Sequence, residues 1–318
     1  MPTSSLPEPA SGEKAAARLA KVSPPSEDLV DGFIRRQEWM EPVAYAVQSA
    51  VAGVYSALGP IGRFAKDAAH GTTVLRHPLH PAVTDAPLGA WLVGVILDWV
   101  ARYDHSVGAG AGTIALAFGT VAAVAAVVTG YTDFYETEGL ERRTALIHGM
   151  IMTLVFVLET GSLGIRWTGD QQAGVVLSTV AVVLAVGGMY VGGHLTFRFG
   201  TMVNRNAFAE GSELFVKVGA AQDFPENTMT RVDVGGMPAL VVRLDGRLRA
   251  IAAGCSHAGG ALEEGDLDGS IVTCPLHGAR FDLCSGRALS GPATFSQPVF
   301  EVRERRDNVE LRVALPLR

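Results

Sequence analysis

Four long apolar stretches dominate the middle of the chain, and each has a length close to the roughly 20 residues that a helix needs to cross a bilayer. The second and fourth contain no charged residue, whereas the first carries Asp85 and Asp98 and the third carries His148 and Glu159. Polar faces at helical period, which a soluble helical bundle would show, are missing. The pattern therefore predicts four transmembrane helices over residues 85–103, 113–130, 144–165 and 173–191.

The pattern on either side of these stretches is different. After residue 213 the apolar residues form short runs separated by turns, and Asp245-Gly246 between two such runs is typical of a β-hairpin. The first residues are rich in Pro, Ser, Ala and charge, which is typical of a disordered tail. We expect a multidomain chain: a tail over 1–40, a pre-membrane segment with a short amphipathic helix over 41–75, an all-α four-helix transmembrane bundle over 76–200, a linker over 201–213 and an all-β domain over 214–318.

Basic residues are distributed unevenly around the four stretches, and this predicts an orientation. One side holds only Arg102 and Arg166. The other side holds Arg63, Lys66, Arg76, Arg142, Arg143, Arg198 and Arg205. Because basic residues favour the cytoplasmic side, we expect a multi-pass plasma-membrane protein with both termini and the β domain in the cytoplasm. The net charge of −6 argues against nucleic acid as a partner.

Two cysteines and two histidines carry the clearest chemical signal. One residue separates Cys255 from His257, a spacer of sixteen residues follows, and two residues separate Cys274 from His277. Such a set suits a [2Fe–2S] cluster, in which two His replace two Cys on one iron, or a tetrahedral zinc ion. Zinc fingers usually separate each ligand pair by two or more residues, so the pattern favours the cluster.

These motifs resemble the Rieske ferredoxin family, and the resemblance covers about residues 207–318. It rests on Cys255-Ser256-His257, on Cys274-Pro275-Leu276-His277-Gly278 and on the loop Gly291-Pro292-Ala293. The resemblance implies that Cys255, His257, Cys274 and His277 hold a [2Fe–2S] cluster and that the β domain transfers electrons.

Departures from the Rieske proteins of respiratory complexes refine this expectation. Those proteins carry a disulfide between the two cluster loops, where this chain has Gly260 and Leu276. They also offer two hydroxyl groups to the cluster sulfurs, where this chain has Ala279 and Phe281. Hydrogen bonds to sulfur raise the reduction potential, so their loss predicts a lower-potential, ferredoxin-type centre.

A second motif introduces the first membrane stretch. The run His77-Pro78-Leu79-His80-Pro81, with Ala86-Pro87-Leu88-Gly89-Ala90-Trp91 beyond it, resembles a bacterial family of four-helix membrane domains whose function is not settled. The resemblance covers roughly residues 71–200 and implies an architecture, but little chemistry.

All four expected helices bring a polar or ionisable group to the same depth near the cytoplasmic side: His80, Asp133, His148 and His194. Ionisable groups inside a membrane are costly and mark candidate sites. We expect His148 and His194 to face each other, with His80 and Asp133 nearby. A hydrogen-bonded core, a b-type haem with two axial His, a non-haem metal and a quinone pocket all remain open.

The candidate cluster ligands and the four membrane helices together predict a Rieske-type electron-transfer protein anchored in the lipid bilayer. We expect it to pass single electrons between a cytoplasmic redox partner protein and a membrane cofactor or redox partner. A quinone- or haem-linked oxidoreductase subunit and a membrane redox sensor are the alternatives. A Rieske oxygenase needs a mononuclear iron site on a large catalytic domain, and no such domain follows here. We therefore expect an electron carrier or oxidoreductase subunit rather than an oxygenase.

Overall fold

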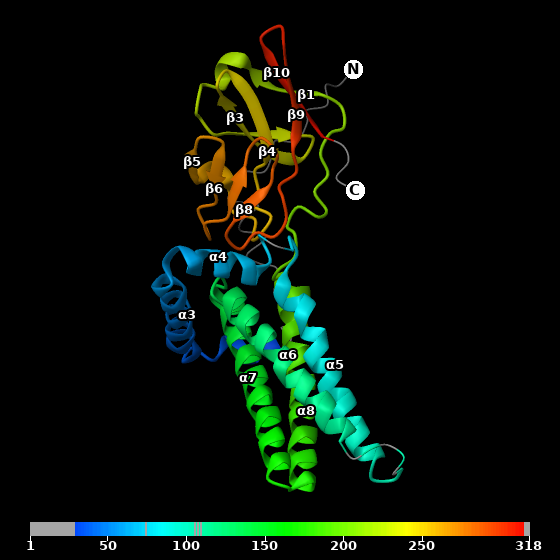
Figure 1. Cartoon of the computed structure of the whole chain (residues 1–318). Coiled ribbons are helices and arrows are strands. Elements are labelled where there is room, and N and C mark those ends of the chain that lie inside the picture. The colour runs from blue at the N-terminus through cyan, green and yellow to red at the C-terminus, as the bar shows by residue number, and fades with distance from the viewer. Residues whose placement is uncertain (1–28, 74, 105, 107, 109, 315–318) are drawn as a thin grey trace, which may run out of the picture.

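The computed structural model describes residues 29–73, 75–104, 106, 108 and 110–314. Within this part of the chain a helical region and a β region lie end to end, as the change in hydrophobic pattern predicts (Figure 1). The helices are α2 (Leu29–Arg35), α3 (Met40–Ala57), α4 (Gly59–His70), α5 (Leu79–Val100), α6 (Ala111–Phe134), α7 (Gly139–Trp167) and α8 (Gln171–His194), and a π-helical turn over Leu195–Phe199 follows α8.

Helices α5–α8 are the four expected membrane spans, since each is long and apolar enough to cross a bilayer. They pack chiefly as two hairpins, α5 with α6 and α7 with α8. Their outer faces are apolar: Ile114, Val121 and Val183 are each at least 66% exposed. Such an exposed apolar belt fits lipid rather than water.

The pre-membrane segment differs from the single short helix that we expected. Helix α3 ends at Ala57, and α4 begins at Gly59, whose positive φ of 56° breaks the helix before Pro60 starts the next one. Helix α4 lies across the end of the bundle, between it and the β region (Figure 1). Residues 59–70 therefore form a separate helix that connects α3 to the bundle, and the sequence analysis did not predict it.

The expected disordered tail lies mostly outside the described residues, but its end is helical. Helix α2 packs on α7, and Ile34 is buried. The Arg143 guanidinium also donates to the Arg35 carbonyl at 3.0 Å. These tertiary contacts order a segment whose composition alone indicates disorder.

Ten short strands form the β region in three antiparallel sheets with the orders β1-β10-β9, β2-β3-β4 and β5-β6-β7-β8. Asp245 and Gly246 both have positive φ, 49° and 73°, as a type I′ hairpin turn between β3 and β4 requires. The strands are β1 (Val216–Ala220), β2 (Thr230–Val234), β3 (Met237–Leu244), β4 (Arg247–Ala252), β5 (Asp266–Asp268), β6 (Ile271–Thr273), β7 (Arg280–Asp282), β8 (Ala288–Ser290), β9 (Phe300–Arg305) and β10 (Asn308–Val313).

A buried ion pair joins the two helical hairpins at the end of the bundle far from the β region. Arg166 Nη2 on α7 lies 2.6 Å from Asp98 Oδ2 on α5, and both side chains are at most 5% exposed. Arg166 Nη1 also donates to Thr113 Oγ1 on α6 at 3.1 Å. The guanidinium therefore ties three of the four spans together.

Replacing Arg166 by Met should strongly destabilise the helical region, because it leaves the Asp98 carboxylate buried without a partner. Breaking a buried pair typically costs about 3–5 kcal/mol, and replacing both partners by apolar residues is often neutral. The double variant Asp98→Leu/Arg166→Met should therefore recover most of the loss. The midpoint of thermal unfolding in detergent, followed by helical circular dichroism, measures both effects.

Arg102→Met is the matched control, because Arg102 lies at the same end of the bundle but is exposed beside the Trp99 ring. Its replacement should cost less than about 1 kcal/mol. Equal losses for Arg102→Met and Arg166→Met would contradict the role of the buried pair.

Candidate iron–sulfur centre and membrane site

Two loops of the same build present the predicted cluster ligands. In the first, Cys255 N donates to Gly260 O and Gly259 N donates to Cys255 O, both at 2.8 Å. In the second, Cys274 N donates to Ala279 O at 2.8 Å and Gly278 N donates to Cys274 O at 3.1 Å. Each loop thus turns back on its cysteine and holds the following histidine beside it.

The four side chains come together at the tip of the β region. Cys255 and Cys274 are 1% and 3% exposed, so both thiols are inside the protein. The His257 and His277 rings lie 5.0 Å apart between centroids, at 87° to each other. Nδ1 of each ring is buried and has no hydrogen-bond partner among the described residues. Such atoms are costly when unsatisfied. Nε2 of His277 is also buried without a hydrogen-bond partner in the described part of the chain, so this criterion singles out Nδ1 as the nitrogen that would bind iron only for His257.

The electrostatics of the loops suit metal ligation. Burial lowers the pKa of His257 to about 3, so its imidazole is neutral. A hydrogen bond from the Cys255 thiol lowers the pKa of Cys274 to about 6, and the same bond together with burial raises the pKa of Cys255. Backbone N–H groups of His257 and Leu276 also stabilise the two thiolates. The donor set, two cysteine sulfurs and two imidazoles, fits a [2Fe–2S] cluster.

The positions that distinguish respiratory Rieske proteins lie where the resemblance placed them. A Cβ added to Gly260 would lie 2.9 Å from Leu276 Cγ, so these residues do face each other between the two loops. Ala279 and Phe281 are fully buried and carry no hydroxyl group. The lower potential that follows from these residues stays a prediction.

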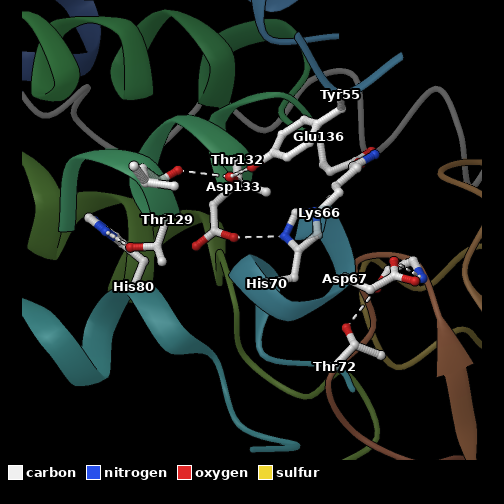
Figure 2. Close-up of polar contacts among 12 residues, drawn as sticks. Tyr55, Lys66, Asp67, His70, Thr72, His80, Thr129, Thr132, Asp133 and Glu136 are labelled. Atoms are coloured by element: carbon white, nitrogen blue, oxygen red, sulfur yellow. Dashed lines mark hydrogen bonds and ion pairs between the residues drawn. The ribbon is translucent and has the colours of Figure 1, made fainter. Parts of the chain in front are cut away.

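The cluster loops rest on the helical region through Gly291. Gly291 N donates to Asp67 Oδ1 of α4 at 2.8 Å, and Thr72 Oγ1, just after α4, donates to Gly291 O at 2.7 Å (Figure 2). Gly291 has a φ of +84°, and a Cβ there would lie 2.8 Å from Ala279 Cα. Only glycine therefore allows this loop to lie between α4 and the second ligand loop.

The ligand histidines face acidic residues of the helical region. His277 Nε2 lies 3.6 Å from Glu138 Oε1, in the loop between α6 and α7. Glu136 of the same loop and His70 of α4 act electrostatically on His257. The imidazole side of the site thus lies over the end of the bundle.

Beneath this contact His70 anchors α4 to the bundle. His70 is fully buried, and its Nδ1 lies 2.8 Å from Asp133 Oδ1 on α6 (Figure 2). Burial disfavours charge on His70, but hydrogen bonds to Asp133 and Glu136 outweigh it and raise its pKa. Despite burial, His70 and Lys66 in turn lower the pKa of Glu136, whose Oε1 lies 2.5 Å from Lys66 Nζ.

Sequence reasoning missed His70 and Glu136 as members of the site. Lys66 and His70 are four residues apart and therefore lie on one face of α4, which was the available signal. Because no helix was expected at residues 59–70, the four-residue spacing was not interpreted as one helix face.

The membrane residues of the tentative site are arranged differently from our expectation. His148 faces His80, with ring centroids 6.3 Å apart, whereas the His194 ring lies beside Tyr190 and Phe199. The His148 ring lies against Gly192 of α8, where an added Cβ would be 2.9 Å from its Cε1. His194 is two residues further on, about 200° around the helix, and so points away from that face.

His80, His148 and Asp133 all border one cavity of about 570 Å³ in the half of the bundle nearest the β region. Asp133 lies between His80 and His70 (Figure 2). The cavity thus begins just beneath the contact between the helical region and the cluster loops.

Comparison with known proteins divides the chain in the same way. Residues 215–301 match the Rieske [2Fe-2S] domain, and residues 76–205 match a family described as a predicted membrane protein (DUF2231). The chain is 37% identical over 99 residues to ferredoxin CarAc of Metapseudomonas resinovorans, a match that covers 31% of this chain and 92% of the relative.

Two further proteins are similar to this chain over the same region. The ferredoxin component of biphenyl 2,3-dioxygenase from Rhodococcus jostii (strain RHA1) is 36% identical over 93 residues, or 29% of this chain and 87% of the relative. The other is a chain in a solved complex of reduced oxygenase and oxidized ferredoxin in carbazole 1,9a-dioxygenase, with 35% identity and a TM-score of 0.31. The match covers 33% of this chain and 100% of that chain. The C-terminal third of the chain thus corresponds to nearly the whole of these small proteins.

Replacing Cys255 or Cys274 by Ser should abolish the cluster, because a hard hydroxyl group does not replace a terminal thiolate ligand of iron. Iron analysis and the EPR signal of the dithionite-reduced protein measure the loss. Cys284→Ser is the matched control, since Cys284 is a free, exposed cysteine in the same domain. Purified wild type with zinc and no iron would contradict the assignment, and so would loss of the cluster in Cys284→Ser alone.

Proposed function

Because the chain belongs to the Rieske [2Fe–2S] ferredoxin family and joins that domain to a membrane domain, we propose that it passes single electrons between a cytoplasmic redox partner and a site in the membrane. When bound, the cluster accepts and releases one electron at a time. The observation that carries the proposal is the contact of the β domain, through Gly291 beside the second ligand loop, with α4 at the end of the bundle.

The chain's own residues support this direction. The two thiols are buried, whereas His277 lies at the contact, with its Nε2 3.6 Å from Glu138 of the membrane domain. Gly291, Asp67 and Thr72 hold the ligand loop on α4, so the imidazole side of the site is kept beside the bundle. A soluble ferredoxin must find its acceptor by diffusion, and here the membrane domain is already in contact.

The electron partner on the other side is proposed by analogy. One relative named above is the ferredoxin component of biphenyl 2,3-dioxygenase, and the solved structure named above is a complex of an oxygenase with a ferredoxin. A soluble redox protein that docks on the β domain is therefore a suitable donor or acceptor. A membrane redox sensor remains the second candidate. Reduction would change the charge of the cluster, and that change could weaken or strengthen the contact at Gly291.

The β domain and both termini are expected on the cytoplasmic side, and Cys284 reports this directly. Cys284 is exposed, whereas Cys255 and Cys274 are buried. A membrane-impermeant maleimide should label Cys284 in inverted vesicles and leave it unlabelled in right-side-out vesicles. Cys284→Ser gives the background. Labelling in right-side-out vesicles alone would reverse the orientation inferred from the basic residues.

Weakening the Gly291 contact should slow electron transfer into the membrane. The double variant Asp67→Ala/Thr72→Val removes both hydrogen bonds, and at about 1 kcal/mol each their loss should lower the equilibrium constant for docking by about thirtyfold. The measurement is the rate at which the flash-photoreduced cluster is reoxidised in native membrane vesicles, with its EPR signal as a check on assembly.

Arg312→Ala is the control, because it breaks the exposed pair with Glu301, on β strands outside this contact. It should leave the rate unchanged. If the double variant reoxidises at the wild-type rate with its cluster intact, the contact is not the electron path.

A further inference from the structure

The two helical hairpins each supply one histidine in the same setting. In the first, His80 Nδ1 on α5 lies 3.0 Å from the Ala126 carbonyl of α6. In the second, His148 Nδ1 on α7 lies 2.9 Å from the Gly188 carbonyl of α8. Four residues after each carbonyl stands a glycine, Gly130 or Gly192, against which the imidazole ring packs.

These contacts fix which nitrogen of each ring is available. A backbone carbonyl only accepts hydrogen bonds, so Nδ1 of both His80 and His148 carries the proton. Nε2 of each neutral ring then presents a lone pair. An N–H bonded to a backbone carbonyl is also the usual support of a metal-bound histidine, because it fixes the tautomer and the ring orientation.

The spacing of the rings suits one metal ion between them. Their centroids lie 6.3 Å apart. Two metal–nitrogen bonds of about 2.0 Å, and about 1.1 Å from each nitrogen to its ring centre, separate two opposite imidazole ligands by about 6 Å. The ion would join the two hairpins, α5–α6 and α7–α8, in the half of the bundle nearest the β region.

The protein supplies only these two ligands. Among the described residues no group of three or more His, Cys, Asp or Glu side chains is placed to hold a metal ion. A structural zinc site needs four protein ligands and a catalytic one needs three. Haem needs only axial ligands, since the porphyrin provides the four others.

The cavity provides the room. Both histidines border the space of about 570 Å³, within the range of roughly 300–1,000 Å³ that is usual for cofactor sites. Its walls are mostly apolar, with Trp91, Phe134 and Phe156 among them. Glycines keep it open, and a Cβ added to Gly149 would meet no atom within 4 Å.

A quinone fits this geometry less well. Quinone carbonyl oxygens accept hydrogen bonds, and neutral rings with the proton on Nδ1 offer no N–H from Nε2. Two imidazole nitrogens that border one mostly apolar space instead suit the iron of a haem, because the porphyrin dianion offsets the charge of the iron ion.

We propose that His80 and His148 are the axial ligands of a b-type haem held between the two helical hairpins of the membrane domain. The inference rests on the proposed function only for its role: this haem would be the membrane cofactor beside the cluster. Gly130 and Gly192 position the two rings against the neighbouring helices, and the Ala126 and Gly188 carbonyls orient them.

The test is the optical spectrum of full-length protein, purified in mild detergent from cells supplied with iron and 5-aminolevulinate. Wild type should show the sharp reduced bands of a six-coordinate, low-spin haem in a dithionite-reduced minus oxidised spectrum. The pyridine haemochromogen assay should give about one haem per chain. His80→Ala and His148→Ala should each lower the haem content by about tenfold or more.

His194→Ala is the matched control, because its ring lies beside Tyr190 and Phe199 rather than between the hairpins. It should keep the haem. His148→Met offers a second variant, in which a retained haem with a changed spectrum and a raised potential identifies the replaced axial ligand. This readout does not depend on loss of the cofactor and so does not require that an alanine variant fold.

The EPR signal of the cluster separates this inference from the proposed function. Wild type with a full cluster signal and no haem bands overturns the haem and leaves electron transfer by the β domain in place. Haem bands that persist at full intensity in both alanine variants overturn the assignment of the ligands. Loss of the cluster signal in wild type counts against the proposed function itself.

Discussion

The contact at Gly291 is the constraint on which the arrangement of the two regions depends. A single residue, Gly291, donates its N–H to Asp67 and accepts with its carbonyl from Thr72, so both of its backbone polar groups are satisfied by α4 and the residues just after it. The same residue packs against Ala279 of the second ligand loop with a backbone geometry that only glycine adopts easily. Any side chain here would separate the ligand loop from the helix, and with it the iron–sulfur site from the membrane domain.

Helix α4 transmits that contact to the bundle through buried charge. His70 is fully buried and bonded to Asp133, whose carboxylate borders the cavity, and Lys66 pairs with Glu136 on the same face. Removing one partner of such a group leaves an unpaired buried charge, which costs far more than the pair contributes. The polar residues between cluster and cavity are thus held together as a unit, which keeps ionisable groups close to both candidate cofactor sites.

The bundle is held at its two ends and left open between them. Arg166 ties α5, α6 and α7 at the far end, and at the near end Glu41 of α3 pairs with Arg142 and Arg143 of α7. Between these anchors the helices meet through small residues, and the cavity lies there. This division explains how apolar spans rich in glycine and alanine can pack firmly and still enclose a space.

Local sequence pattern predicts the four spans, the β-hairpin at Asp245-Gly246 and the candidate cluster ligands, whose spacing within two short loops needs no distant contact. Which histidines lie close together depends on how the helices pack. His80 and His148 face each other because each ring packs on a glycine of the neighbouring helix, and His194, two residues past Gly192, is turned away. The same holds for helix α4 and His70. They are buried between the bundle and the β region, and the sequence pattern does not show that these two regions come together. Periodicity reports which face of a helix is apolar, but the partner of that face is set by packing.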